Sequence, residues 1–337
     1  MILSTQSRET YFNTMEFQRK SKEKRFGLSY MGSKSKHWRW LLRRIPACGT
    51  FYDLFAGGCS VGHMMGHFDK CEKVVFNDVN AMPIKLFRMA IDGELPPPSW
   101  MSLEEFRERN KAGDPLSLPF SFGAKTSTYF CSKAVEPWQK ELFHAKISGD
   151  YSFFSDILRT DDFCELSRAW GRKHPDLLNA AAKLLAPEGV EWSNKSYITL
   201  CRSYPFERRE RLSRFDELPI NLPVEFRNLD YRAAADDAGE DDVIYADPPY
   251  ANKTSYGVAF HNEEFWEWCR QPRRALLIIS EYSAPSDFVE IWAKKVTCAM
   301  STDGNVSRPI ERLFVHKSQV DRYWFECGMP TLPLQFD

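Results

Sequence analysis

The sequence predicts an α/β fold: a doubly wound, mostly parallel sheet that carries a mainly helical inserted domain. Three observations support this prediction. Short apolar runs alternate with helical patterns in the two end portions of the chain, as they do in repeated βα units. The run 276–279, Leu-Leu-Ile-Ile, is apolar throughout, which is typical of a strand covered on both faces. The alternation stops after Ile91 and resumes near residue 224, which indicates an insertion.

Several segments have the composition of strands, because each is short, rich in β-branched or aromatic residues and bounded by turn-forming residues. They are 51–55, 73–78, 224–231, 243–246, 275–280, 295–300 and 313–316. Helical patterns over 61–68 and 83–91 fill the first gaps between them. This order predicts a sheet whose neighbouring strands are mostly parallel.

The break in the alternation defines the expected domains. Residues 95–222 begin with a Pro run, Pro96 to Pro98, and continue with helical, aromatic and basic segments such as 104–111 and 176–185. We expect an inserted domain there, with the Pro run as its hinge. The sheet domain then comprises 27–94 and 223–337, and 1–26 form an N-terminal extension that can be disordered.

Composition places the chain among ordinary globular proteins. Its apolar content is 43% and its charged content 27%, which are typical values. No stretch has the length of a membrane span, and the polar start lacks the apolar core of a signal peptide. The nine cysteines are scattered without a Cys-x-x-Cys pair, so neither a zinc site nor a disulfide framework is indicated. We expect a cytoplasmic protein without a metal, a membrane contact or an obligate protein partner.

The overall charge does not indicate a nucleic-acid partner. Lys and Arg number 45 and Asp and Glu number 46, for a formal net charge of −1, so such binding would have to come from local asymmetry. Residues 19–25 and 195–214 are basic stretches, and 203–218 alternates in charge. On a helix, such alternation forms either a solvated face or a surface that contacts phosphates. The candidate DNA contacts are Lys195, Arg202, Arg208, Arg209 and Arg211.

The segment 243–250, Val-Ile-Tyr-Ala-Asp-Pro-Pro-Tyr, is the most informative in the chain. The carboxylate of Asp247 and the carbonyl of Pro248 can each accept one hydrogen of an exocyclic amine. Pro248 and Pro249 stop the strand without starting a helix, which keeps that carbonyl available to a ligand. Tyr250 can stack on a planar base. These four residues are the candidate catalytic residues, although an acidic residue and a Pro-Pro turn can also simply end a strand.

The segment 51–62 predicts a ligand-binding turn after the first strand. It runs from an apolar strand through Asp53 and Phe55 into Gly57 and Gly58 and then into a helix. Glycines let a ligand approach the backbone at the carboxyl edge of a sheet. The Gly-Lys-Ser/Thr ending of a phosphate loop and the three-glycine spacing of a dinucleotide site are both missing. An Asp at the strand end suits a cationic ligand such as S-adenosylmethionine.

Further acidic strand ends complete this expected cofactor site. Asp78 ends the second strand, where a carboxylate can bind both hydroxyls of an adenosine ribose, and Asp230 ends the third, where it can bind the cofactor's adenine. Lys34, in a Gly-Ser-Lys turn, can bind a carboxylate such as that of methionine. The candidate cofactor-binding residues are Tyr30, Lys34, Asp53, Phe55, Gly57, Gly58, Asp78, Asp230 and Tyr231.

Taken together, these motifs resemble the Dam-type, or D12-class, DNA adenine-N6 methyltransferases of bacteria and phages. The family's Tyr-x-Gly-x-Lys start falls at 30–34, its Asp-x-Phe-x-Gly-Gly turn at 53–58 and its Asp-Pro-Pro-Tyr motif at 247–250. The segments 121–123 and 136–138 resemble phage-type members. Weaker matches follow at 254–256, 279–282 and 308–314. Members often carry a third glycine where this chain has Cys59.

The resemblance implies a class I S-adenosylmethionine-dependent methyltransferase fold, with 95–222 as the target-recognition domain. It implies methyl transfer from S-adenosylmethionine to the N6 amine of adenine in double-stranded DNA, by base flipping and direct in-line transfer. A restriction-modification context is also typical of such enzymes.

Several alternatives stay open at the level of the sequence. An RNA adenine-N6 methyltransferase would use the same catalytic segment. Cytosine-N4 enzymes more often carry Ser-Pro-Pro-Tyr and protein glutamine enzymes Asn-Pro-Pro-Tyr, so Asp247 favours adenine. A catalytically inactive nucleic-acid-binding protein that kept the fold is the remaining alternative.

Overall fold

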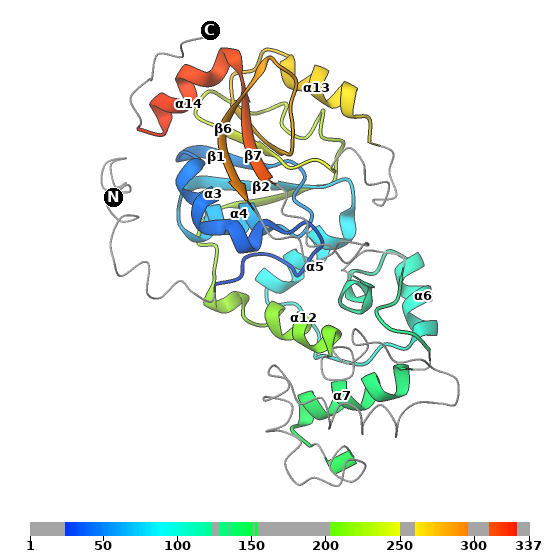
Figure 1. Cartoon of the computed structure of the whole chain (residues 1–337). Helices are drawn as coiled ribbons and strands as arrows, with labels where there is room; N and C mark the ends of the chain where they lie inside the picture. The colour runs from blue at the N-terminus through cyan, green and yellow to red at the C-terminus, as the bar shows by residue number, and fades with distance from the viewer. Residues whose placement is uncertain are drawn as a thin grey trace. The chain divides into compact units, whose positions relative to one another are not determined.

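The chain forms two compact units (Figure 1). The computed structural model describes residues 24–122, 128–133, 135–150, 152–153, 203–249, 260–295 and 310–328. Unit 1 contains Met1–Leu28, Gly32–Phe87 and Glu217–Asp337. Unit 2 contains Ser29–Met31 and Arg88–Asp216.

Unit 1 is built on a seven-stranded sheet in the order β3-β2-β1-β4-β5-β7-β6. The strands are β1 (Cys48–Asp53), β2 (Cys71–Asn77), β3 (Val224–Arg227), β4 (Val243–Ala246), β5 (Leu276–Glu281), β6 (Phe288–Lys295) and β7 (Ile310–His316). The first five pair in parallel, and β7 runs antiparallel to both β5 and β6. The predicted α/β fold with a mostly parallel sheet is therefore confirmed.

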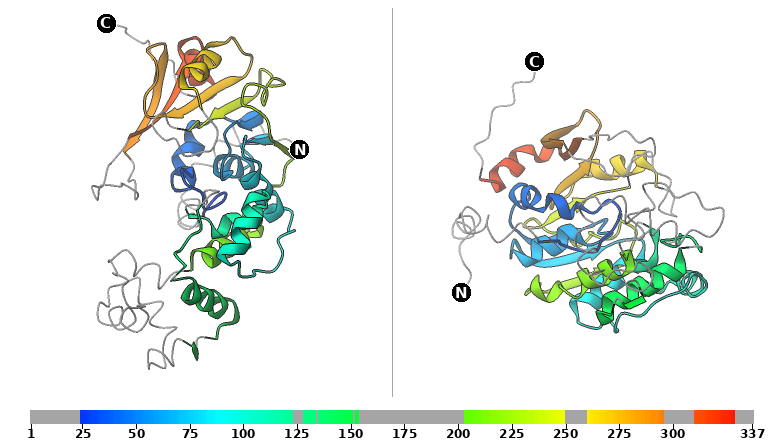
Figure 2. Two further views of the ribbon diagram at one scale, coloured as in Figure 1. Left: turned by 90° about the vertical axis from the view of Figure 1, so that its right-hand side faces the viewer. Right: turned by 60° about the horizontal axis from the view of Figure 1, so that its bottom comes forward.

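Helices pack on both faces of this sheet (Figure 2). The elements of unit 1 are η1 (Lys34–His37), α3 (Trp38–Arg44), α4 (Ser60–His67), most of α5 (Ala81–Ile91), α13 (Asn262–Arg270) and α14 (Val320–Glu326). A Cβ atom on Gly62 of α4 would lie 2.4 Å from the ring of Phe76, and one on Gly66 would lie 3.3 Å from Val74. Side chains alternate along β2, so Val75 faces the opposite side, where it joins the cluster around α13.

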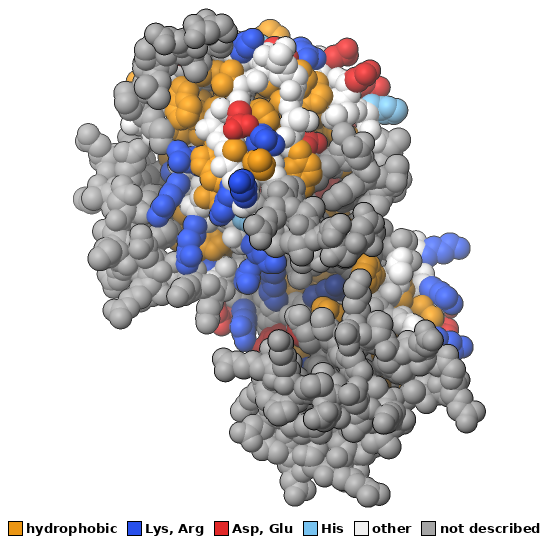
Figure 3. All heavy atoms as spheres, in the orientation of Figure 1, with side chains coloured by type: hydrophobic (Ala, Val, Ile, Leu, Met, Phe, Trp, Pro, Cys, Tyr) orange, Lys and Arg blue, Asp and Glu red, His pale blue; other side chains and the backbone are white. Residues whose placement is uncertain are grey.

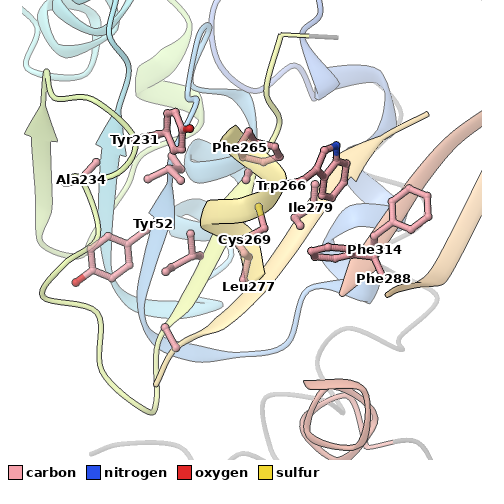
Figure 4. Close-up of a cluster of buried hydrophobic side chains, with 14 of the residues drawn as sticks. Tyr52, Tyr231, Ala234, Phe265, Trp266, Cys269, Leu277, Ile279, Phe288 and Phe314 are labelled. Carbon is pink, nitrogen blue, oxygen red and sulfur yellow. The ribbon is translucent and has the colours of Figure 1, made fainter. Parts of the chain in front are cut away.

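The apolar cluster around α13 forms the core of one face of the sheet (Figure 4). Phe265, Trp266 and Cys269 of α13 pack against Leu277 and Ile279 of β5. Phe265 is 0% exposed, and burying a side chain of this kind contributes about 2 to 3 kcal/mol. Because β4 and β5 are buried along their whole length, their runs are apolar without a break.

Two strands, β3 and β6, differ most from their sequence-based predictions. The sixth strand was expected over 295–300, but β6 spans Phe288–Lys295, and 296–300 lie outside the described residues. Its burial pattern is irregular because the register with β7 shifts between Glu290 and Trp292, which hides the two-residue period. The third strand was expected to reach residue 231 but ends at Arg227. Asn228 donates from Nδ2 to the carbonyls of Asp78 and Val79 instead.

Unit 2 is helical over most of its described residues. It contains α6 (Leu103–Lys111), η2 (Pro115–Phe120), α7 (Glu136–Ser148) and α12 (Tyr204–Leu212), followed by η4 (Phe215–Glu217) at its boundary. Ser102 caps α6 by accepting a hydrogen bond from the amide of Glu105, as a serine at this position often does. The core of unit 2 is a cluster of mostly aromatic side chains, namely Met101, Phe106, Phe120, Tyr129, Phe130 and Phe143.

The predicted helix over 104–111 corresponds to α6, and the charge-alternating segment 203–218 contains α12. The helix expected over 176–185 lies outside the described residues. None of the helices that the structure describes combines the length and the apolar character needed to cross a membrane.

Candidate active site

Five carboxyl groups gather at the edge of the unit 1 sheet where β1, β2, β4 and β5 end. We call them the acidic edge: Asp53, Asp78, Asp247, Glu281 and Glu311. Parallel strands bring their carboxyl ends to one edge of a sheet, where α/β proteins bind ligands. Glu311 reaches the same edge from the opposite direction, because β7 is antiparallel and its Arg312 lies in register with Glu281.

Lys34, the first residue of η1, places an ammonium group among these carboxylates. Its Nζ lies 3.2 Å from Oδ1 of Asp247 and 2.9 Å from Oε2 of Glu311, and its side chain is 5% exposed. Burial alone lowers the pKa of Lys34, but the charges and hydrogen bonds of the two carboxylates outweigh it and raise the pKa to about 12. Lys34 is therefore charged, and it ties η1 to both β4 and β7.

Asp247 and Pro248 follow β4 beyond the last paired residue. The register of β4 ends at Tyr245 on the β1 side and at Ala246 on the β5 side. The side chain of Asp247 is 18% exposed, so its carboxylate is held by Lys34 and still reaches the surface. Pro249 is half-buried, and Tyr250 lies outside the described residues.

Asp53 binds the backbone just after the glycine turn, the turn that contains Gly57 and Gly58. Its Oδ2 accepts a hydrogen bond of 2.9 Å from the amide of Gly62 in the first turn of α4. Burial raises the pKa of Asp53 to about 7, the Gly62 amide acts against the shift, and the charges of Asp247 and Asp78 add to it. Asp53, where β1 meets the turn, therefore has a pKa near neutral pH.

Asp78 binds the backbone of the glycine turn directly. Its Oδ2 accepts 2.7 Å from the amide of Gly57, and its Oδ1 accepts 2.8 Å from the amide of Asn80. Burial raises the pKa of Asp78, while these two amides act against the rise. Asn77 lies just before it and donates to the carbonyls of Leu54 and Leu229, which fastens the ends of three strands together.

Cys59 occupies a backbone conformation that favours glycine. Its φ is +59°, in the left-handed region that a residue with a Cβ atom adopts at some cost. This explains why a third glycine is common at this position in the resembling family. The turn also lies tightly against Gly27, since a Cβ atom there would come within 2.2 Å of the carbonyl oxygen of Gly58. The amide of Leu28 donates to that same carbonyl at 2.7 Å.

The remaining predicted cofactor residues lie in different settings. Phe55 packs edge-on against Phe265, and Tyr231 is 8% exposed within the α13 cluster. Asp230 is 57% exposed on its side chain and lies 3.6 Å from Nε of Arg232. Tyr30 is half-buried and belongs to unit 2.

Part of the chain matches a known protein family. The model of the D12 class N6 adenine-specific DNA methyltransferases matches residues 30–111. The match includes Lys34, the glycine turn and Asp78, and it confirms the family recognised from the sequence. It ends before Asp247, so the role of that residue has to be argued from the geometry.

The rRNA methyltransferase aviRa from Streptomyces viridochromogenes is similar to this chain at 13% sequence identity and a TM-score of 0.33, over 85% of this chain and 84% of that chain. None of the curated proteins matches the sequence. The match over residues 30–111 indicates a DNA methyltransferase, and the reaction of that family in general is methyl transfer to adenine in DNA.

Helix α12 does not present all of its arginines to a ligand. Arg208 donates from Nη1 to the carbonyls of Pro119 at 2.7 Å and Ser121 at 2.5 Å, and burial lowers its pKa to about 10. Arg209 is 9% exposed and donates to the carbonyl of Pro96. Both side chains therefore brace unit 2 internally. Their predicted DNA contacts, and that of half-buried Arg211, stay predictions, while Lys195 and Arg202 lie outside the described residues.

Glu281 and Glu311 are site residues to which the sequence assigned no role. Both fall inside segments that resemble late motifs of the D12 class. Glu281 is the last residue of the apolar strand β5, which is the same signal that identified Asp53 and Asp78. Glu311 is the second residue of β7, and only the sheet order shows that this antiparallel strand brings it to the same edge.

The acidic edge fits a methyl donor that carries positive charge. Asp247 and Glu311 contact the ammonium group of Lys34, and Glu281 also interacts with its charge. Glu281 is 5% exposed, and its Oε1 is buried without a hydrogen-bond partner. Burial, together with the charges of Asp247 and Glu311, raises the pKa of Glu281 to about 7, against the opposing effects of the Tyr282 amide and Lys34. An unsatisfied buried carboxylate oxygen is costly, and a cationic group bound there would satisfy it.

Proposed function

We propose that this protein transfers the methyl group of S-adenosylmethionine to the N6 amine of adenine in double-stranded DNA, with Asp247 and the carbonyl of Pro248 as the acceptors that hold the amine. The observation that carries the proposal is the position of Asp247. It follows the central strand β4 beyond its last paired residue, inside the acidic edge, with its carboxylate 3.2 Å from the buried ammonium group of Lys34.

The cofactor would bind along the ends of β1, β2 and β3. Asp78 and the turn at Gly57 and Gly58 would take the ribose and methionine portions, and exposed Asp230 the adenine. When bound, S-adenosylmethionine supplies a methyl group on a sulfonium, which is already a good leaving group. The carboxylates of Asp53 and Glu281 would face its positive charge, which ionised carboxylates favour at close range.

The amine of adenine needs help because its lone pair is delocalised into the ring. Asp247 would accept one N–H hydrogen and the Pro248 carbonyl the other, so that the nitrogen can pyramidalise toward the methyl group. The target base has to leave the duplex to reach this edge, at a cost of a few kcal/mol. We propose that Tyr250 stacks on the flipped base and offsets part of that cost.

Lys34 would act on Asp247 as a positioning residue. The charged ammonium group of Lys34 lies 3.2 Å from the carboxylate of Asp247. It would hold that carboxylate in place and favour its ionised form. The same lysine was expected to bind the methionine carboxylate of the cofactor, and we propose that it contributes to both contacts. Glu311 completes the arrangement, because it shares Lys34 with Asp247 and thereby links β7 to the catalytic strand end.

Unit 2 would supply the recognition of the DNA sequence. Reading base edges requires protein surface beyond a catalytic sheet, and unit 2 is a helical body with its own aromatic core. We therefore propose that the insertion over 95–222 is a target-recognition domain.

The proposal is tested by incubating the purified protein with methyl-labelled S-adenosylmethionine and either unmethylated genomic DNA or total RNA. We expect label in DNA, and nucleoside analysis should show N6-methyladenine. Label confined to RNA, or N4-methylcytosine as the product, would contradict it. The Asp236→Ala variant is a suitable control for handling of the protein, because Asp236 is exposed and is not one of the five residues of the acidic edge.

A further inference from the structure

A basic groove lies in unit 1 outside the acidic edge. Its volume is about 260 Å³. The lining residues are Lys24, Arg25, Ser35, Lys36, His37, Trp38, Arg39, Trp40, Arg43 and Lys294. Lys and Arg supply six of these ten residues and Asp and Glu none. Figure 3 shows Lys and Arg side chains gathered over α3 and the end of β6.

The charge of this groove is not balanced by carboxylates within the described part of unit 1. Other cations of the unit are paired, for example Arg270 with Asp287 at 2.6 Å and Arg312 with Glu290 at 2.7 Å. No described carboxylate forms an ion pair with Lys36, Arg43 or Lys294. The groove therefore concentrates positive charge on a protein whose formal net charge is −1.

Glu311 is the carboxylate whose charge acts on His37 in the groove, and it is already bound by Lys34. The charge of Glu311 reaches His37, but burial, with Lys294, Lys34 and Lys36 in support, lowers the pKa of His37 to about 4. Glu311 itself is 7% exposed and bound by Lys34. Burial also lowers the pKa of Lys24 and of Lys294. A bound anion would raise the pKa values of these three side chains.

Aromatic rings hold several of the cations in place without neutralising them. Trp40 and Trp292 stack at 3.9 Å between ring centroids and 14° between planes, which fixes α3 to β6. Lys294 lies 6.0 Å from the Trp40 ring, and Arg39 lies 5.2 Å from the Trp38 ring. Contacts of this kind stabilise a cation while leaving its charge available. The groove is thus preorganised for an anionic ligand.

Two ring nitrogens in the lining point to the same ligand class. Nδ1 of His37 and Nε1 of Trp40 are buried without a hydrogen-bond partner. The indole N–H of Trp40 can only donate, and neutral His37 can donate from Nδ1. Both can therefore bind an anionic oxygen, and a buried donor without a partner is destabilising.

We propose that this groove binds the phosphate backbone of the DNA duplex, as a contact of unit 1 that is separate from the target-recognition insertion. The inference rests on the proposed function for its choice of partner. Phosphate oxygens satisfy the uncompensated cations and the two ring donors at once, without reading any base. η1 connects the groove to the reaction, because Lys36 and His37 line the groove while Lys34 of the same turn holds Asp247.

The test measures DNA affinity by fluorescence anisotropy, with a labelled duplex of random sequence and no methyl donor. A groove variant carries Lys36→Ala, Arg43→Ala and Lys294→Ala. Its matched control carries Lys85→Ala, Arg274→Ala and Lys317→Ala, which remove the same charge from exposed positions of unit 1. We expect the groove variant to bind roughly 30- to 100-fold more weakly at about 50 mM salt, with its log–log salt slope reduced by about three, and the control to change less than about threefold.

Equal losses in the two triple variants would overturn the proposal. So would a groove variant that loses affinity for a labelled RNA strand but keeps its affinity for duplex DNA. If the triple variant does not fold, the single exposed substitution Lys36→Glu still tests the groove through the same measurement. Methyl transfer by the wild-type protein is assayed in parallel. Transfer to DNA with no groove effect refutes the groove alone, and a groove effect without transfer refutes the proposed function alone.

Discussion

Two lysines of one short helix differ completely in their surroundings. Lys34 is 5% exposed and lies between the carboxylates of Asp247 and Glu311. Lys36 is two residues further along η1, is exposed, and lines the basic groove. The first is a neutralised charge inside the acidic edge and the second is an uncompensated charge on the surface. Neighbouring residues of the same type can thus serve the chemistry and the substrate separately.

The contrast also explains why charge counted along the sequence is a poor guide to charge available for binding. The basic stretch 195–214 contains Arg208 and Arg209, whose guanidinium groups are bound by backbone carbonyls within unit 2. The basic groove draws its cations from residues 24–43 and from Lys294. Only the fold brings these two segments together, through the stacked rings of Trp40 and Trp292.

The sharpest way to break the comparison is to replace each lysine by Met. Lys34→Met should lower the single-turnover methylation rate on the order of 100-fold, because removing one partner of a buried pair leaves the other charge uncompensated. Lys36→Met should instead raise the Kd for DNA about three- to tenfold. Rapid-quench methylation and anisotropy binding on both variants measure the two effects.

A pH profile separates positioning by Lys34 from a merely structural role. The carboxylate of Asp247 faces Lys34, Glu311, Glu281 and Asp53. Without Lys34 only acidic neighbours remain in this set, so the pKa of Asp247 rises. The rate deficit of Lys34→Met should then be larger at about pH 6 than at about pH 8.5, and Lys34→Arg should restore part of the rate. A deficit that does not vary with pH would contradict this role.

Asp78 provides a second and smaller test of the acidic edge. Asp78→Ala removes the acceptor for the Gly57 amide as well as the expected ribose contact. We expect the KM for S-adenosylmethionine to rise about 10- to 30-fold and the KM for DNA to change less than about twofold. Asp230→Ala should have a weaker effect on the cofactor, since Asp230 is exposed. Equal changes in both KM values for Asp78→Ala would exclude a cofactor role.

Glu281 gives the smallest expected effect, which appears in stability. Burial, Asp247 and Glu311 raise the pKa of Glu281 to about 7 against the opposing Tyr282 amide and Lys34. The folded protein therefore binds this proton more tightly than the unfolded protein, and the stabilisation is lost as the pH rises through about 7. Glu281→Gln should raise the Tm relative to wild type by a few degrees at about pH 8 and by little at about pH 4.5.

The control for this measurement is Glu263→Gln, at an exposed position in the first turn of α13. It should show the same small difference from wild type at both pH values. A Glu281→Gln variant whose difference from wild type is the same at both pH values would contradict the raised pKa.

The central sheet could be predicted from the sequence because each buried strand appears there as a short apolar run. β4 and β5 are buried throughout and were placed to within a residue. β6 was placed too far along the chain, because its shift in register against β7 is decided by the partner strand. Antiparallel pairing at the end of the sheet depends on residues remote in sequence, and a single chain does not show it.

In the candidate site, too, local motifs could be predicted from the sequence and contacts between remote residues could not. Asp53, Asp78 and Asp247 were identified because each ends or follows a strand in a recognisable motif. The ion pair of Lys34 with Asp247 joins residues 213 positions apart in the sequence, 34 and 247, and no local pattern indicates it. The predicted cofactor residues Phe55 and Tyr231 pack together with Phe265 at the edge of the α13 core, which their sequence position did not show.

The most direct test of the account is the single-turnover methylation rate of Asp247→Ala at saturating DNA and S-adenosylmethionine. Lys34 keeps Glu311 as a partner in this variant, so the protein should fold, and its affinities for DNA and cofactor should stay within a few-fold of wild type. We predict a loss of rate on the order of 1,000-fold or more. A variant that methylates adenine within about tenfold of the wild-type rate would show that Asp247 does not hold the reacting amine.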